Sequence, residues 1–298
     1  MCGWTVAGSE VRVFVGDARV PGIPVGDRGL AYGDGIFETM RAHAGELPWW
    51  DLHWARLERG ASRLGLALPP REQARDEAGR LLDGADAVLR LQLNRGSGGR
   101  GYAPLQNAVP VWMLARHPLP AAMPPQGVAL RWCSTRLAIQ PALAGIKHCN
   151  RLEQVLARAE WHADGAEDSD ADDGLMCSME GDVISATAAN LFVLHDGRWL
   201  TPLLDRCGVA GVCRQWLLDN FEVEQVRLTV ADVETADAIV LTNAVRGILP
   251  VARLGTRRWR QHPGVLEWQR RLAQAHPGFA EADSTPPGPH QSSPSEMP

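Results

Sequence analysis

The proline-rich segment HPLPAAMPPQG at residues 117–127 is the feature that most limits how this chain can fold. Proline lacks a backbone N–H and the segment has little hydrophobic periodicity, so we predict a connection between two lobes. The patterns on both sides mix strand and helix signals. We therefore predict a two-domain α/β (α+β) fold, with an N-terminal domain at 1–118, a linker at 119–126, a C-terminal domain at 127–279 and a disordered tail at 280–298.

Alternating and 3.6-periodic apolar patterns predict the main elements of each lobe. In the first lobe we expect a strand and a returning strand around a Gly16–Asp17 turn, a helix and two further strands. In the second lobe we expect a strand, a helix just after Lys147, a hairpin that turns at Asp196–Gly197, another helix and two last strands. The corresponding ranges are 11–20, 49–68, 88–96 and 109–116, then 128–137, 150–166, 183–202, 208–221 and 237–255.

Composition excludes several classes of function. The 298 residues are 45% hydrophobic and 22% charged with a net charge of −5, which indicates a globular chain without a broad basic surface for nucleic acid. No apolar run approaches the roughly 20 residues that span a bilayer, and we read no signal peptide.

The six cysteines form no CxxC pair, so we expect reduced thiols and a cytoplasmic location. We expect no metal; the acidic loop at 167–174 lacks the spacing of an EF-hand.

The segment AGIKHCNRLEQ at residues 144–154 contains Lys147, the only lysine in a chain with 30 Lys+Arg residues. Arginine serves as well as lysine in ion pairs and phosphate contacts, but a guanidinium cannot form an imine. An ε-amine can lose its proton when it is desolvated, and it then attacks a carbonyl carbon. Lys147 is therefore a candidate imine-forming residue, while compositional drift toward arginine is the alternative.

Three further motifs could bind anions. GVAGVCRQ at 208–215 places two glycines before a predicted helix, whose free N–H groups would suit a phosphate, although a tight turn into a helix is the simpler interpretation. Arg56 could hold a phosphate with two parallel hydrogen bonds, or it could be solvated. RGSGGRGY at 95–102 could bind a carboxylate, or it could be a hairpin loop.

Taken together, an imine-forming lysine, a phosphate cradle and carboxylate-binding arginines suggest pyridoxal phosphate chemistry. The chain resembles the fold-type IV pyridoxal-phosphate enzymes, which include the D-amino-acid and branched-chain aminotransferases. The likeness runs from about Val11 to Leu254. It rests on DRGLAYGDGIFETMR, HWARL, RGSGGRGY, LAGIKHCNRLEQVLAR, ATAANLF, GVAGVCRQ and LTNAVRGILPV.

The resemblance implies specific roles for residues of this chain. Lys147 would hold the cofactor covalently and act as the catalytic base, and Thr39 would lie near the reacting carbon. Arg56 would bind the cofactor phosphate together with the helix-start N–H groups of Val212 and Cys213, assisted by Thr242 or Asn243. Arg95, Arg100 and Tyr102 would lie near the substrate entrance. The same resemblance implies a homodimer, in which that loop could act across the interface.

One position departs from the family pattern. Relatives typically carry a glutamate five residues before the asparagine of ANLF, where it pairs with the pyridine nitrogen of the cofactor. Here that position is Ser185. A hydroxyl can hydrogen-bond the nitrogen but supplies no negative charge, so the electron sink should be weaker. Cys213 also stands where aminotransferase relatives often have threonine.

Within the family, RGSGGRGY, AGIKHCNRLEQVL and the threonine of GDGIFET favour a lyase over an aminotransferase. The activity that the resemblance implies is conversion of 4-amino-4-deoxychorismate to 4-aminobenzoate and pyruvate, a step of folate biosynthesis. A D-amino-acid or branched-chain aminotransferase is the alternative. A non-catalytic relative is a further alternative, but a scaffold would not need its only lysine at this position.

Overall fold

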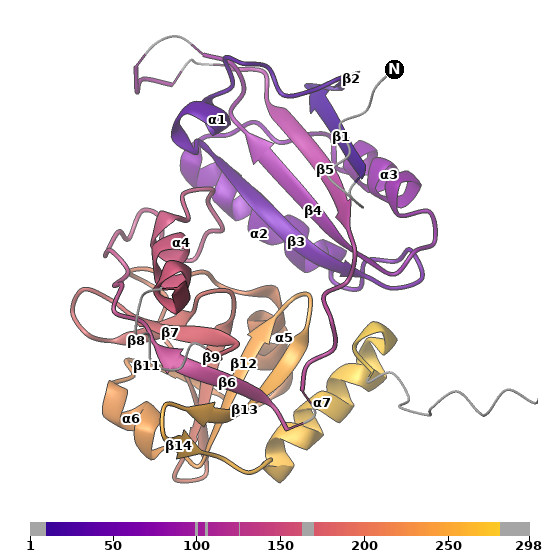
Figure 1. The fold of residues 1–298 in the computed structure, drawn as a ribbon. Helices are drawn as coiled ribbons and strands as arrows, with labels where there is room; N and C mark the ends of the chain where they lie inside the picture. Colours follow the sequence, from indigo (N-terminus) through magenta and orange to yellow (C-terminus); the bar gives the residue numbers. More distant parts are fainter. Residues whose placement is uncertain (1–9, 99–100, 105–106, 125, 163–169, 281–298) are drawn as a thin grey trace, which may run out of the picture.

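The structure, a computed structural model, describes residues 10–98, 101–104, 107–124, 126–162 and 170–280. The strands form two separate sheets, one from each half of the chain (Figure 1). Residues 118–127 connect the last strand of the first sheet to the first strand of the second. The mixed α/β architecture therefore agrees with the predicted fold class, while the predicted domain boundaries stay a prediction.

The first sheet is antiparallel throughout, with the strand order β2-β1-β5-β4-β3. Helices cover one of its faces, where Leu57, Leu81 and Leu89 belong to one apolar core. β3 pairs with β4 alone within this sheet and is its edge strand. The elements are β1 (Glu10–Val15), β2 (Ala18–Val20), α1 (Arg28–Tyr32), β3 (Gly35–Ala42), α2 (Trp50–Leu64), α3 (Arg71–Leu82), β4 (Ala87–Asn94) and β5 (Val111–His117).

The second sheet closes on itself. Its order is β11-β10-β9-β12-β13-β6-β7-β8, and β8 also pairs with β9, so that six strands form a ring. The closing register places Ser185 opposite Asn190. The strands are β6 (Val128–Trp132), β7 (Asp173–Cys177), β8 (Val183–Ala186), β9 (Asn190–His195), β10 (Arg198–Pro202), β11 (Glu224–Val226), β12 (Ala238–Asn243), β13 (Gly247–Leu254) and β14 (Arg257–Arg258).

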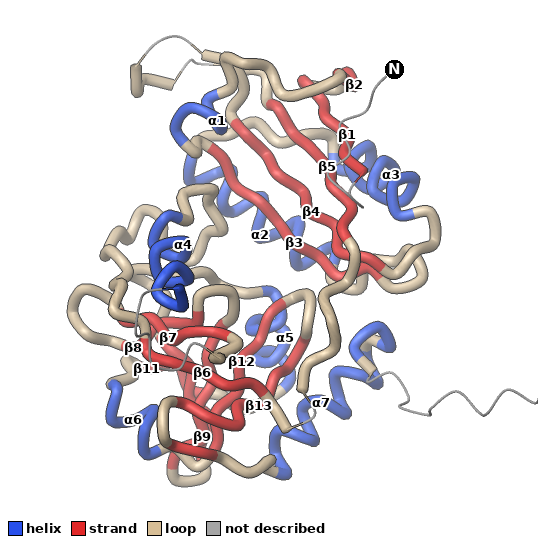
Figure 2. Tube along the Cα trace, viewed as in Figure 1, coloured by secondary structure: helices blue, strands red, loops and turns tan. Residues whose placement is uncertain are grey.

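Helices surround this ring and one of them leads back to the first half of the chain (Figure 2). They are α4 (Leu152–Ala159), α5 (Val212–Asn220), α6 (Val230–Thr235) and α7 (Pro263–Ala275). After α7 a short 3₁₀ turn at Pro277–Phe279 brings Phe279 against Trp49, with ring centroids 4.7 Å apart. Arg41 of β3 donates to the carbonyl of Val245, 3.0 Å away. The two halves are therefore packed together by contacts far apart in sequence.

Most predicted elements are confirmed, and their ends show which local signals were missed. The Asp196–Gly197 turn has positive φ at both residues, as a two-residue hairpin between β9 and β10 requires. The helix predicted at 49–68 was wrong at its end, because Gly65 adopts a left-handed conformation (φ 63°) that stops α2 at Leu64. The sequence analysis did not predict α3 or α7.

Leu57 of α2 provides a test of the first core. Its side chain is 1% exposed, whereas that of Leu68 is 37% exposed. We expect Leu57→Ala to lower the free energy of unfolding by about 2–5 kcal/mol, because it removes buried methylene groups and leaves a cavity. Urea denaturation followed by tryptophan fluorescence measures this, with Leu68→Ala as the control that should change stability by less than about 1 kcal/mol. Equal effects of both substitutions would contradict the described packing.

Candidate active site

Lys147 lies on a segment that is hydrogen-bonded to the edge of the first sheet. The N–H of Phe37 donates to the carbonyl of Lys147 at 2.9 Å, and the N–H of Cys149 donates to the carbonyl of Gly35 at 2.9 Å. An edge strand has unpaired N–H and C=O groups that must find partners. Because β3 is the edge strand, it can hold the lysine segment between the two halves of the molecule.

The amine of Lys147 lies in an environment that disfavours its charge. Nζ lies 4.4 Å from the centroid of the Phe37 ring. Burial, together with the nearby cations Arg56, Arg151 and Arg90, lowers the pKa of Lys147 to about 7, while Glu38 opposes the shift. The residue as a whole has intermediate solvent exposure, while its amine is almost wholly surrounded by protein atoms. Near neutral pH a substantial fraction of this amine is therefore neutral and nucleophilic.

A buried ion-pair cluster lies beside this lysine. Glu38 of β3 accepts hydrogen bonds from Nε of Arg56, at 2.8 Å, and from Nη2 of the same guanidinium. Its carboxylate also lies 2.6 Å from Nδ1 of His53. All three residues are buried. Arg56, together with the hydrogen bond to His53, outweighs burial and lowers the pKa of Glu38 to about 2, while burial lowers the pKa of His53. The cluster is therefore a carboxylate, a guanidinium and a neutral imidazole.

Arg56 also connects this cluster to the start of α5. Its Nη1 donates to the carbonyl of Ala210 at 2.9 Å, and the remaining N–H donors of the guanidinium stay available. Gly211 precedes α5, and a Cβ placed there would lie 1.9 Å from Oδ1 of Asn190. Asn190 in turn donates to the carbonyl of Val209 at 2.8 Å. Only glycine fits this close approach, which explains the second glycine of the 208–215 motif.

The predicted anion-binding residues lie around the same turn. No side chain caps α5, so the N–H groups of Val212 and Cys213 in its first turn have no intrahelical partner. Thr242 at the end of β12 is fully buried, and its Oγ1 has no hydrogen-bond partner among the described residues. A buried hydroxyl without a protein partner can pair with a bound ligand or a water molecule. The Cys213 thiol is buried, which raises its pKa.

Ser185, Thr39 and Asn243 have different surroundings. Ser185 is buried at the seam of the ring, opposite Asn190, and its hydroxyl makes no hydrogen bond with a described residue. Thr39 lies on β3 two residues after Phe37, so strand alternation places its side chain on the same face as the Phe37 ring. The side-chain oxygen of Asn243 accepts from the N–H groups of Val245 and Arg246.

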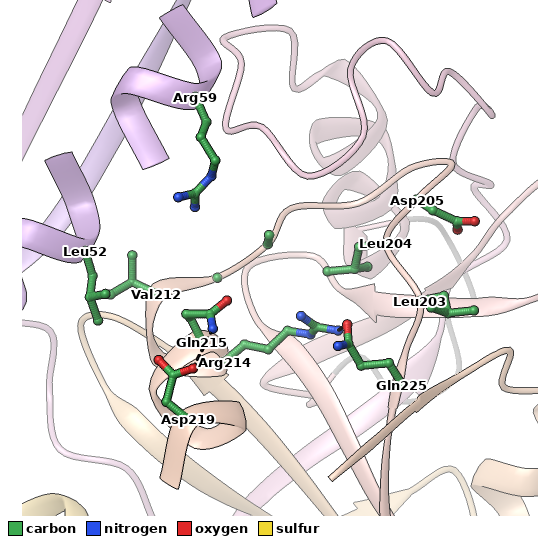
Figure 3. Close-up of a pocket in the computed structure, with 12 residues that line it drawn as sticks. Leu52, Arg59, Leu203, Leu204, Asp205, Val212, Arg214, Gln215, Asp219 and Gln225 are labelled. Atoms are coloured by element: carbon green, nitrogen blue, oxygen red, sulfur yellow. Dashed lines mark hydrogen bonds between the residues drawn. The ribbon is translucent and has the colours of Figure 1, made fainter. Parts of the chain in front are cut away.

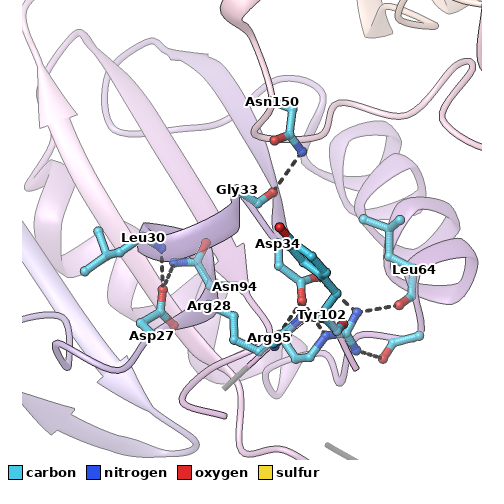
Figure 4. A network of polar contacts seen from close by, with 12 residues as sticks. Asp27, Arg28, Leu30, Gly33, Asp34, Leu64, Asn94, Arg95, Tyr102 and Asn150 are labelled. Atoms are coloured by element: carbon cyan, nitrogen blue, oxygen red, sulfur yellow. Dashed lines mark hydrogen bonds and ion pairs between the residues drawn. The ribbon is translucent and has the colours of Figure 1, made fainter. Parts of the chain in front are cut away.

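Arg95 is part of a polar network that also contains Arg28 and Asp34 (Figure 4). It donates to Asp34, at 2.8 Å from Nε, and to the carbonyls of Leu64 and Gly65. These bonds tie the loop after β4 to the end of α2 and leave little capacity for a ligand, so the geometry does not favour the predicted substrate contact. Tyr102 is 86% exposed and lies beside Tyr32. Arg100 lies outside the described residues.

Two cavities adjoin the second half of the chain. One of about 650 Å³ is lined by the start of α5 together with Arg59, Arg214 and Gln225 (Figure 3). Ala210, Gly211 and Val212 at the start of α5 line it, whereas Lys147 and Thr242 do not. The other, of about 610 Å³, is lined by Arg151, Thr187 and Asn243 among others. Within the described ranges, no group of three His, Cys, Asp or Glu side chains could hold a metal ion.

Sequence reasoning missed Glu38, Arg90 and Arg151. Arg90 lies opposite Thr39 in the β3–β4 register, with its guanidinium carbon 4.0 Å from the centroid of the Phe37 ring. Glu38 precedes Thr39 in the GDGIFETM segment. Because side chains alternate along a strand, Glu38 points to the opposite face of β3, toward α2 and Arg56, and this signal could have identified it. No pattern signalled that three guanidinium groups gather around one amine, because they come from separate elements.

Comparison with known proteins defines the class. The family described as amino-transferase class IV matches residues 35–254, and the chain belongs to this family. An aminodeoxychorismate lyase of Vibrio harveyi is 38% identical over 239 residues, covering 77% of this chain and 86% of that protein.

Solved structures agree with this family. The crystal structure of 4-amino-4-deoxychorismate lyase from Pseudomonas aeruginosa is 39% identical with a TM-score of 0.80, and the match covers 88% of this chain and 98% of that one. An aminotransferase from Brucella abortus, bound to the cofactor PLP, is 19% identical with a TM-score of 0.74 over 89% of this chain and 99% of that one. The latter likeness shows the fold alone. No helix in the described part of the chain is long and apolar enough to cross a membrane.

The buried Glu38 carboxylate predicts a pH-dependent stability. Its folded pKa of about 2 lies below the ordinary value of 4.5, so its contribution is present above about pH 4.5 and is lost as the pH falls toward 2. Glu38→Gln leaves Arg56 buried without a counter-charge, and we expect it to lower the free energy of unfolding at pH 7 by about 3–5 kcal/mol.

The measurement is urea denaturation between pH 7 and pH 3. The difference between Glu38→Gln and the unsubstituted chain should narrow as the pH falls. The control is Glu234→Gln, which removes an exposed carboxylate of α6. A stability of Glu38→Gln equal to that of the unsubstituted chain at pH 7 would contradict the buried ion pair.

Proposed function

We propose that this chain is a pyridoxal-phosphate-dependent lyase that converts 4-amino-4-deoxychorismate to 4-aminobenzoate and pyruvate. The observation that carries the proposal is the only lysine of the chain, held at a lowered pKa beside Arg56 and the start of α5. Its family membership and the two lyases at 38% and 39% identity support the same activity.

The residues of the site fit the cofactor. Pyridoxal phosphate needs an amine for its aldehyde and donors for its phosphate, and it supplies an electron sink for the carbon attached to the substrate amine. Lys147 would hold the aldehyde. Arg56, the N–H groups of Val212 and Cys213, and the unpartnered hydroxyl of Thr242 would hold the phosphate. Ser185 would face the pyridine nitrogen, and Asn243 would assist from the end of β12.

In this proposal Lys147 carries the proton of the reaction. An amine with a pKa of about 7 can accept a proton and return it at neutral pH, because both of its forms are populated. Thr39, on the same face of β3, would orient the leaving oxygen or pass a proton to it. Formation of an aromatic product makes the elimination favourable, which would tolerate a serine at position 185.

Arg90 is the arginine we assign to a substrate carboxylate. Its guanidinium is partly buried, lies over Phe37 as the Lys147 amine does, and forms no ion pair with a described residue. Its side chain donates to Gln92 at 3.1 Å and keeps further donors available. A guanidinium of this kind suits a carboxylate next to an amine that attacks the cofactor, and 4-amino-4-deoxychorismate carries such groups.

The test is release of 4-aminobenzoate by purified chain supplied with pyridoxal phosphate, chorismate, ammonia and an aminodeoxychorismate synthase. We expect Lys147→Ala to reduce this release by at least roughly 10²–10⁴-fold and to abolish the absorbance of lysine-bound cofactor, because no other side chain can form that bond. Arg75→Gln, on the exposed face of α3, is the control that should keep both.

Other outcomes point to other functions. If D-alanine or leucine converted the cofactor to its amine form and no 4-aminobenzoate appeared, the chain would be an aminotransferase instead. Persistence of the lysine-bound absorbance in Lys147→Ala would refute the assignment of Lys147.

We further propose that the chain acts as a homodimer. Leu152, Val155 and Leu156 lie on one face of α4 and are 74%, 59% and 60% exposed, and Leu30 of α1 is 59% exposed. Exposed apolar clusters of this kind are typical of interfaces between proteins. A second copy of the chain would cover these side chains, in line with the homodimer that the family resemblance implies.

Leu156→Glu tests the dimer by light scattering after size-exclusion chromatography. We expect this substitution to shift the chain toward the monomer, because it places a charge in an apolar interface. Leu266→Glu on α7, where the leucine is 47% exposed, is the matched control that should leave the mass unchanged. A monomeric unsubstituted chain at micromolar concentration would contradict the proposal.

A further inference from the structure

The lysine segment has two hydrogen-bonding edges, and they are satisfied by different partners. On one edge the carbonyl of Lys147 and the N–H of Cys149 bond to β3. On the other edge the carbonyls of Ile146 and His148 accept hydrogen bonds from the side chain of Arg151, at 3.3 Å from Nη2 and 2.9 Å from Nε. One guanidinium therefore takes the place of a neighbouring strand on the outer edge of this segment.

Glu153 is near enough to Arg151 to favour its charged form, but the two side chains do not form an ion pair. Arg151 forms no ion pair with a described residue, and burial lowers its pKa to about 10. The charged groups that face the Lys147 amine are Arg56 from α2, Glu38 from β3, Arg90 from β4 and Arg151. The titratable side chains of His53 on α2 and of the neighbouring His148 and Cys149 also interact with it. Since Glu38 already pairs with Arg56 and Glu153 makes no ion pair with Arg151, the charge of Arg151 still disfavours the protonated amine.

We propose that Arg151 is a positioning residue for Lys147, whose guanidinium fixes the carbonyls on both sides of the lysine and whose positive charge favours the neutral amine. The link to catalysis rests on the proposed function, but the effect on the amine does not require the cofactor. Arginine suits this role because its planar fork donates from two nitrogens in fixed directions, and it stays charged. A lysine ammonium has three donors but only one nitrogen, so it does not hold two carbonyls in the fixed directions of a guanidinium.

The single lysine makes a direct measurement possible. Biosynthetic labelling with [ε-¹³C]lysine gives one side-chain resonance, and its titration in cofactor-free protein reports the pKa of Lys147 alone. We expect Arg151→Gln and Arg151→Met to raise this pKa by on the order of one unit, because both remove a nearby cation. Arg75→Gln, which removes an exposed and unpaired charge on α3, should leave it unchanged. Arg151→Lys is avoided because it would add a second labelled residue.

Hydrogen exchange separates the two parts of the role. The amides of Phe37 and Cys149 should exchange faster in Arg151→Met, which has no donor for the carbonyls, than in Arg151→Gln, whose amide retains one. A merely structural arginine would change exchange without moving the lysine pKa. Unchanged pKa values in both folded variants would overturn the proposal.

Activity then shows which proposal has failed. If the unsubstituted chain releases 4-aminobenzoate while the pKa does not respond to Arg151, the inference fails and the function stands. If the pKa responds but no 4-aminobenzoate forms, the function fails and the inference stands. If the function and the inference both stand, the pH profile of the lyase reaction in Arg151→Gln should shift to higher pH, in step with the higher pKa of Lys147.

Discussion

The buried ion pair between Glu38 and Arg56 is the interaction on which the rest of the site depends. It joins β3 to α2, and the third nitrogen of the same guanidinium holds the carbonyl of Ala210 before α5. Three elements from both halves of the chain are thereby fixed around one carboxylate. A buried charge is tolerated only when it is paired and hydrogen-bonded, which Glu38 achieves with Arg56 and the neutral His53.

The amine of Lys147 lies in the positive electrostatic potential that this arrangement leaves uncompensated. Glu38 is the counter-charge of Arg56, so the arginines Arg90 and Arg151 contribute positive potential around the amine. Desolvation acts in the same direction, and both favour the neutral form. The site is therefore prepared for an anion and a neutral amine together, which is the combination that a phosphorylated aldehyde and a carboxylate-bearing substrate require.

The sequence predicted the fold class, the family and the lysine because these depend on patterns within short segments. Alternation in β4 and β5, the glycines before α5 and the isolated Lys147 could each be recognised locally. The partners of the arginines could not, since Arg56 and Ala210 are separated by 154 positions and Arg95 is bonded to Asp34 and the end of α2. Short helices such as α1 and α6 were missed for a similar reason, because their stability comes from caps and tertiary contacts rather than a long periodic face.

The contact between Trp49 and Phe279 affects how the chain can be made. A ribosome releases the first half well before Phe279 emerges, and during that interval the indole of Trp49 lacks the ring of Phe279 that packs against it in the folded protein. His276, whose ring lies 5.1 Å from the same indole, arrives equally late. The nascent N-terminal half therefore keeps this aromatic surface uncovered until residues 276–279 have been synthesised.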